Sequence, residues 1–252
     1  QLRIRVNTCL DKLCDRDTFS IASSQLENMA RNLSGEEISS FLNCISGIDS
    51  SEKSIARCYC VSLLGVLSAA HGDSLAAHVP RMIAVVISRL RDPDSAVRSA
   101  CVNAVTLITA SISSTPLSVI LSPLVVALFR EQDRNAQTGL SLCLSAAVEA
   151  RRREIDTAEM NKLLPRISKL VKSNGFRAKP SLLLFIGNIV NCGCRGSVSC
   201  SISTAIEFLS SDDWAARKAA AVVLIAAAGT DSAAEFKTQC VSALERRRFD
   251  KV

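Results

Sequence analysis

Apolar residues recur along most of the chain at intervals of three and four positions, in runs separated by turn residues. The run 92–104, DPDSAVRSACVNA, shows the pattern most clearly. Pro93 ends one helix, and Asp94 or Ser95 can accept hydrogen bonds from the free backbone amides of the next. The apolar positions that follow form one stripe of that helix: Val97, Ala100, Cys101 and Ala104.

The same pattern returns at a regular interval. A copy at 212–223, DDWAARKAAAVV, aligns Arg217 with Arg98. A third copy has Arg57 at this position, and a weaker fourth has Gln137. The spacing is about forty residues or a multiple of it, which is typical of HEAT-type solenoids built from helix pairs. The sequence therefore predicts an all-α fold, an α-α superhelix of about six helix pairs with a C-terminal capping helix.

Turn residues divide the chain into these pairs. Pro80 is expected to kink or start a helix, and Gly72 to end one in a left-handed conformation. A final amphipathic helix, about 233–247, would cap the open end, and residues 1–252 are expected to form a single domain. The expected helix pairs are 2–13 with 18–32, 36–48 with 53–70, 74–91 with 94–111, 116–130 with 136–153, 157–172 with 180–191, and 197–210 with a partner ending near 228.

Composition agrees with close helix packing. Hydrophobic residues make up 48% of the 252 residues and aromatic residues only 4%, whereas large β-sheets favour aromatics. The longest uncharged run, 102–129, contains Pro116 and Pro123, so no transmembrane helix is expected. The first residues enter directly into an amphipathic helix and do not resemble a signal peptide.

Eleven cysteines raise the choice between disulfides, a metal site and packing. Several lie among apolar residues at helical spacing, and Cys58/Cys60 and Cys192/Cys194 form C-x-C pairs. A metal site needs converging ligands, but the chain has only two histidines, His71 and His78. We therefore expect buried, reduced thiols and no metal, and hence a reducing, cytoplasmic compartment.

Charge and motifs exclude several classes of function. The formal net charge of +6 favours an acidic partner, but the sequence has no helix-turn-helix, finger or basic aromatic pattern for nucleic acid. Nor does it contain a G-x-S-x-G elbow, a Walker A motif or a dinucleotide loop. We expect no catalytic residues, no cofactor, no small-molecule substrate and no membrane partner. An α-helical enzyme would require an acid-base cluster in a pocket.

Four runs together resemble one family. These are LDKLCDRDT at 10–18, AAHGDS at 69–74, RLRDPDSAVRSAC at 89–101 and SSDDWAARKAAA at 210–221. They resemble the N-terminal TOG-like array of the TORTIFOLIA/SPIRAL family of plant microtubule-associated proteins, over essentially the whole chain. The resemblance implies a non-enzymatic module that binds tubulin or the microtubule lattice, with a role at cortical microtubules and in directional cell growth.

In TOG domains, the loops inside the helix pairs line one edge and contact tubulin. Basic side chains on such an edge would suit an acidic tubulin surface. Many TOG domains that bind free tubulin carry a tryptophan in the first loop; its absence from 14–17 favours the lattice over free tubulin. The resemblance implies tubulin contacts by these loop residues: Arg16, Asp17, Lys53, Asp94, Ser95, Arg134, Asn135, Arg177, Lys179 and Trp214.

Structural roles compete with contact roles at several positions. Arg57, Arg98 and Arg217 match a ladder position where HEAT arrays pair arginine with a neighbouring aspartate. Asp94 and Asp213 suit helix caps. Trp214 could pack into the next unit or offer an exposed anchor. The sequence pattern assigns no structural role to Arg16, Arg134 and Arg177. They are therefore the best candidates for contact with a partner. The alternative function is a general HEAT scaffold for another acidic protein or peptide.

Overall fold

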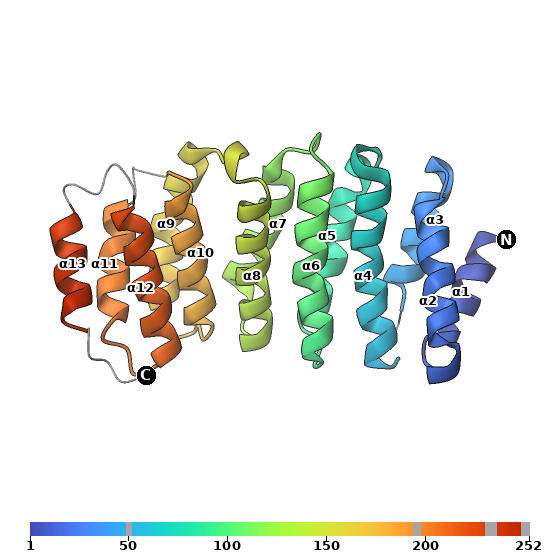
Figure 1. Ribbon diagram of the computed structural model, residues 1–252, viewed down its shortest axis with the longest axis horizontal. Helices are drawn as coiled ribbons and strands as arrows, with labels where there is room; N and C mark the ends of the chain where they lie inside the picture. The colour runs from blue at the N-terminus through green and yellow to red at the C-terminus, as the bar shows by residue number, and fades with distance from the viewer. Residues whose placement is uncertain (49–51, 194–197, 230–235, 248–252) are drawn as a thin grey trace. The chain divides into compact units, whose positions relative to one another are not determined.

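The structure is a computed structural model that describes residues 1–48, 52–193, 198–229 and 236–247, and the ordered elements in these ranges are all helical. The predicted all-α fold of six helix pairs and a final helix is confirmed there (Figure 1). The pairs are α1 (Leu2–Lys12) with α2 (Arg16–Arg31), α3 (Gly35–Ser46) with α4 (Ser54–His71), α5 (Val79–Arg89) with α6 (Ser95–Ser111), α7 (Leu117–Arg130) with α8 (Arg134–Ala150), α9 (Thr157–Lys172) with α10 (Lys179–Asn191), and α11 (Val198–Phe208) with α12 (Trp214–Ala228), followed by α13 (Lys237–Glu245).

The chain divides into two compact units, Gln1–Ala127 and Leu128–Val252. In the first unit, α2, α4 and α6 pack side by side as one layer, while α1 packs on α3 and α5 packs on α6. In the second unit, α8, α10 and α12 form the equivalent layer, and α9, α11 and α13 pack in sequence as the other (Figure 1). Each unit therefore repeats the same two-layer arrangement.

Aspartates start several of these helices. Their carboxylates accept hydrogen bonds from backbone N–H groups two or three residues further on, which would otherwise lack partners. The caps predicted at Asp94 and Asp213 are confirmed. The residues that cap helices in this way are Asp15, Asp94, Asp133, Asp156 and Asp213.

The third pair begins differently from the expected range. The segment Gly72–His78 forms a 3-10 helix, and α5 starts only at Val79. Pro80 lies in the first turn of α5, where its missing N–H leaves no bond unmade. Gly72 ends α4 as predicted and has a positive φ of +50°, but its ψ of −131° differs from the left-handed helical conformation that was expected. The expected 74–91 helix is therefore wrong in its first five residues.

Two expected features lie partly outside the described residues. The turn 49–52 is described only at Glu52, and the expected start of the last helix falls in 230–235. Where the structure describes the last helix, it runs from Lys237 to Glu245. Its one buried residue, Cys240, anchors it in the second unit, where it packs on α11 and α12. This position agrees with the predicted capping role.

One stretch contradicts the expectation of no membrane-spanning candidate. Ser54–Arg89 has a mean hydropathy of 1.3 in its most apolar window, and is long and apolar enough by length and composition to cross a membrane. The structure divides it into α4, a 3-10 helix and α5. Because α4 packs against both α2 and α6, burial between neighbouring helices explains its apolar composition.

The ten cysteines in the described ranges form no disulfide bonds, and Cys194 lies outside these ranges. The predicted packing role is confirmed by burial of Cys9, Cys101, Cys143 and Cys240, whereas Cys44 is only half-buried. Burial raises the pKa of Cys101 to about 12. Such a thiol is held as a small hydrophobic side chain rather than as a reactive thiolate.

Candidate interaction edge formed by the helix-pair loops

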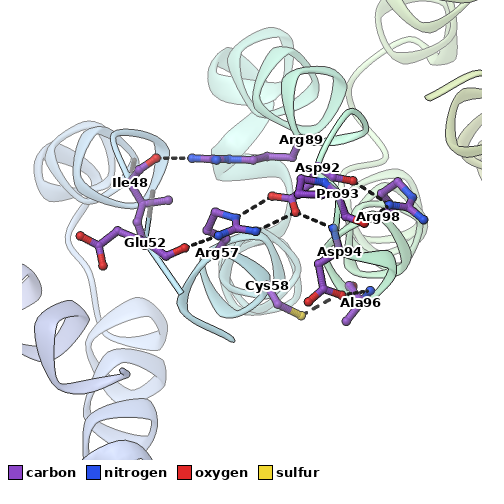
Figure 2. Close-up of polar contacts among 10 residues, drawn as sticks. All are labelled: Ile48, Glu52, Arg57, Cys58, Arg89, Asp92, Pro93, Asp94, Ala96 and Arg98. Atoms are coloured by element: carbon purple, nitrogen blue, oxygen red, sulfur yellow. Dashed lines mark hydrogen bonds and ion pairs between the residues drawn. The ribbon is translucent and has the colours of Figure 1, made fainter. Parts of the chain in front are cut away.

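A buried ion pair joins the second and third helix pairs. Arg57, in the first turn of α4, donates from Nε to Asp92 Oδ2 at 2.7 Å and from Nη2 to Asp92 Oδ1 at 2.9 Å (Figure 2). Only 8% of the Arg57 side chain and 4% of the Asp92 side chain are exposed. The two parallel bonds match the guanidinium to the carboxylate. The predicted pairing of a ladder arginine with a neighbouring aspartate is confirmed here.

Further contacts hold the loops around this pair. Arg57 also donates to the carbonyl of Glu52, and Arg89 donates to the carbonyl of Ile48 (Figure 2). The backbone N–H of Asp94 donates to Asp92 Oδ1 at 2.9 Å. The Arg57 guanidinium therefore connects the loop before α4 with the loop before α6.

The charges of the pair reinforce each other. Burial alone would raise the pKa of Asp92, but the hydrogen bonds from Arg57 and from the backbone of Asp94 outweigh it, so the pKa lies below its ordinary value. The hydrogen bond to Asp92 raises the pKa of Arg57. Both groups are thus held in their charged forms, which is what a buried pair requires.

The other two ladder arginines bind backbone carbonyls of their own loops. Arg98 Nη1 donates to Asp92 O at 2.7 Å and to Pro93 O at 2.8 Å. Arg217 Nη1 donates to Ser211 O at 3.0 Å and to Asp212 O at 3.1 Å. The predicted structural role therefore holds in these bonds, although the acceptors are carbonyl oxygens. Both arginines follow the capping aspartate of their helix by four residues, and the long side chain with its several N–H donors reaches back to the loop from there.

Gln137 occupies the ladder position of the fourth pair and joins two loops. Its Nε2 donates to Glu131 O at 3.0 Å and to Gly175 O at 3.4 Å. Its Oε1 accepts from the backbone N–H of Arg177 at 2.8 Å and of Ala178 at 3.3 Å. An amide both donates and accepts, so one buried side chain fixes the loops before α8 and α10. The sequence pattern marked this position only as a weak copy.

Three of the ten predicted contact residues also support the fold. Asp94 caps α6 through the N–H of Ala96, which lowers the pKa of Asp94. Lys53 Nζ donates to the carbonyl of Cys14 at 2.8 Å and so links the first two loops. The ammonium of Lys179 lies 5.6 Å from the centre of the Phe208 ring, a cation–π contact.

The remaining loop cations point to solvent. Arg16, Arg134 and Arg177 are exposed, and their side chains form no hydrogen bond or ion pair with the part of the chain that the structure describes. Arg134 and Arg177 lie on the two loops that Gln137 joins. Arg16 begins α2, beside the loop that Lys53 contacts. Besides Lys53, the other exposed polar residues of the predicted set are Asp17, Ser95 and Asn135.

Trp214 is the first residue of α12, and 53% of it is exposed. Of the two roles predicted for it, this exposure favours a surface anchor. The indole lines a pocket of about 630 Å³ between α12 and α13. Sequence analysis missed this pocket because its far wall comes from the last helix. The other lining residues are Leu209, Arg217, Lys218, Ala221, Leu244 and Arg247.

No group of three or more His, Cys, Asp and Glu side chains could hold a metal ion in the described ranges. His71, one of the two histidines, forms a 2.7 Å hydrogen bond between its Nε2 and the carbonyl of Ala30, which ties α4 to α2.

The two-layer helix pairs and the loop ladder define an α-solenoid of the HEAT type. One solved structure of similar fold describes how Kap95p binding induces the switch loops of RanGDP to adopt the GTP-bound conformation. A chain in it matches 98% of this chain with a TM-score of 0.63 at 17% identity, and the match covers 34% of that chain.

The family follows from the sequence. The TORTIFOLIA1 N-terminal family model matches residues 1–252, and the chain belongs to this family. TORTIFOLIA1-like protein 4 of Arabidopsis thaliana is 48% identical over 255 residues, which cover 100% of this chain and 41% of that protein. Microtubule-associated protein TORTIFOLIA1 of Arabidopsis thaliana is 33% identical over 268 residues, covering 100% of this chain and 31% of that protein. The chain thus spans less than half the length of these relatives.

Proposed function

We propose that the chain is a non-enzymatic, TOG-like module that binds tubulin or microtubules through its helix-pair loops, and that residues 1–252 act as one domain. The observation that carries the proposal is the match of the whole chain to a family that includes a relative named microtubule-associated protein. The role in cortical microtubule organisation and directional growth, and the cytoplasmic, cytoskeletal location, are part of the same proposal.

Exposed cations support the loops as the contact surface. Arg16, Arg134 and Arg177 are kept in place by helix starts and by the Gln137 network, yet their guanidinium groups are left to solvent. Because the backbone of these loops is already held in place, less entropy is lost when their charged side chains bind an acidic surface. The formal net charge of +6 adds long-range attraction to such a surface.

Co-sedimentation with taxane-stabilised microtubules tests the proposal. The loop variant carries Arg16→Glu, Arg134→Glu and Arg177→Glu. Its matched control carries Arg3→Glu, Lys162→Glu and Lys169→Glu, three exposed residues outside these loops. Both variants lower the formal net charge from +6 to zero. We expect the loop variant to bind at least about tenfold more weakly than the control, because close charge pairs add to the general attraction.

Three other outcomes would oppose the proposal in different ways. Unchanged binding by the loop variant would remove the loops from the contact surface. Equal losses in both variants would leave only non-specific attraction by net charge. No co-sedimentation of the unmodified chain at low salt, together with no binding of free tubulin, would reject microtubule binding and favour the general scaffold.

A further inference from the structure

The pocket between α12 and α13 combines an apolar wall with a cationic rim. The wall is formed by the Trp214 indole together with Leu209, Ala221 and Leu244, and the rim by Arg217, Lys218 and Arg247. A volume of about 630 Å³ is within the range of pockets that enclose small ligands or peptide side chains. All seven residues belong to the second compact unit.

Hydrogen bonds hold two cations of the rim in position. Arg217 donates to the carbonyls of Ser211 and Asp212, at 3.0 and 3.1 Å. Arg247 Nη2 donates to Ser210 Oγ at 2.7 Å and ties the end of α13 to the loop before α12. Ser210 Oγ is a neutral acceptor, so this contact positions the Arg247 guanidinium without neutralising its charge.

The third cation of the rim, Lys218, is available to a ligand. Lys218 forms no hydrogen bond or ion pair with any residue in the described ranges. No Asp or Glu is among the lining residues that the structure describes. Lys218 and Arg247 are therefore the rim cations with which an anionic ligand could pair.

The apolar wall of the pocket suits an apolar group of a ligand. Trp214 is the only tryptophan of the chain, and 53% of it is exposed although Leu209 beside it is buried. An exposed indole in a concave site, flanked by arginines, has the composition of an interface hot spot. Tryptophan provides a large rigid contact surface with little side-chain entropy to lose.

We propose that this pocket binds an acidic peptide segment in which one large apolar side chain is flanked by carboxylates. The apolar side chain would lie against Trp214, and the carboxylates would pair with Lys218 and Arg247. The site goes beyond the proposed function, because it is complete within the second unit whichever protein supplies the segment. Nucleic acid fits less well, since among the described lining residues there is no Asn, Gln, Ser or Thr to read base edges and only one aromatic ring.

Trp214 itself reports occupancy, because no other tryptophan contributes to the emission. The probe is a nine-residue peptide of glutamates with a central leucine, titrated into the unmodified chain while tryptophan fluorescence is recorded. We expect a saturable change in emission. A peptide with serine in place of the leucine should bind at least about tenfold more weakly, because it loses the contact with the indole.

Variants separate the rim from general charge. Lys218→Glu should weaken binding about tenfold, whereas Lys169→Glu, an exposed lysine on α9 with the same change in charge, should leave it within about twofold. Circular dichroism checks that both variants fold, and Lys218→Gln provides a milder second variant. The variant with Arg16→Glu, Arg134→Glu and Arg177→Glu should bind the peptide normally, so failure of microtubule binding and failure of this site are distinguishable.

Several results would overturn the inference. Equal affinity for the leucine and serine peptides would show attraction by charge alone. Equal losses in Lys218→Glu and Lys169→Glu would place binding elsewhere. A single-stranded oligouridylate that changes the emission at lower concentration than the leucine peptide would assign the pocket to nucleic acid. Trp214→Leu, followed by calorimetry, should retain weaker peptide binding; unchanged affinity would exclude the indole from the site.

Discussion

Arg57 and Asp92 are 35 residues apart in the sequence, yet they form a two-bond ion pair that is almost wholly buried between the second and third helix pairs. Within the first unit, this contact fixes the loop before α4 against the loop before α6 (Figure 2). This pair of side chains is therefore a central contact between two neighbouring loops of the first unit.

Removal of either partner should destabilise the first unit strongly. Arg57→Ala and Asp92→Ala each leave one charge buried without its counter-ion, so each should lower the free energy of unfolding by about 3 kcal/mol. The double variant should cost clearly less than the sum, with a coupling energy of at least about 1 kcal/mol. Urea unfolding followed by circular dichroism gives the free energy of unfolding of the unmodified chain, of each single variant and of the double variant.

The exposed pair Arg31–Glu27 is the control for that cycle. Its atoms lie 3.5 Å apart on α2, and 54% and 41% of the two side chains are exposed. Water screens such a pair, so its coupling energy should stay below about 0.5 kcal/mol. Similar coupling energies in the two cycles would show that burial adds nothing at Arg57 and Asp92.

Acid should remove the Asp92 contribution. The folded pKa of Asp92 lies below the ordinary value of 3.8, because the bonds from Arg57 and Asp94 outweigh the effect of burial. Because the pKa of Asp92 is lower in the folded chain than in the unfolded chain, ionised Asp92 stabilises the fold at pH values above the unfolded pKa. This stabilisation is lost as the pH falls through the folded pKa. Between pH 6 and pH 2, stability should therefore fall less steeply in Asp92→Asn than in the unmodified chain. Parallel pH profiles would contradict this assignment.

Gln137 offers a local test in the second unit. Gln137→Ala removes the acceptor for the N–H groups of Arg177 and Ala178 and should cost about 1–3 kcal/mol, as expected for unsatisfied buried groups. Amide hydrogen exchange at Arg177 and Ala178 should accelerate, while exchange in the core of α10 should follow only the global loss of stability. Gln137→Glu keeps the acceptor but loses the donor to Glu131 O and Gly175 O, so it should also destabilise. Unchanged exchange in both variants would mean that Gln137 does not hold the loop.

The helix pairs were predictable because local sequence patterns determine them. The hydrogen-bond partners of the arginines were not. Arg57, Arg98 and Arg217 recur with a cap and an apolar stripe, and this pattern alone predicts helix pairs. Which oxygen each arginine meets depends on how helices pack: Arg57 reaches Asp92 of the next pair, while Arg98 reaches carbonyls of its own loop. Backbone groups carry no sequence signal, so the sequence pattern marks Gln137 only as a weak copy and does not predict the loops that it joins.

The site beside Trp214 shows the same limit. The sequence identifies one tryptophan at a helix start, and both a core role and a surface role suit it. The choice depends on Leu244 and Arg247, which follow it by thirty residues and more and come from a different helix. The predicted contact residues Arg16, Arg134 and Arg177 are exposed in the structure, and tubulin contact by them stays a prediction.

Two glycines should respond in opposite ways to alanine. A Cβ at Gly187, inside α10, would meet its nearest neighbour, Val223 Cγ2, at an ordinary 3.6 Å. Gly187→Ala should therefore raise the free energy of unfolding by about 0.5–1 kcal/mol through helix propensity. Gly72 has φ +50°, a conformation that alanine disfavours, so Gly72→Ala should lower stability by about 1 kcal/mol. Urea unfolding compares the two, and the same sign for both would contradict the backbone assignment.

Thiol reactivity should separate the cysteines by burial. Burial raises the pKa of Cys60 and Cys101 to about 12, so at pH 8 only about one thiol in ten thousand is ionised. Cys14 is half-buried near the chain surface. In the native chain, iodoacetamide should alkylate Cys14 much faster than Cys60 or Cys101, as measured by peptide mass spectrometry over time. In concentrated guanidinium chloride, the three rates should converge, because unfolding removes the burial that separates them. Equal rates in the native chain would place Cys60 and Cys101 in contact with solvent and contradict the packing of α4 on α6.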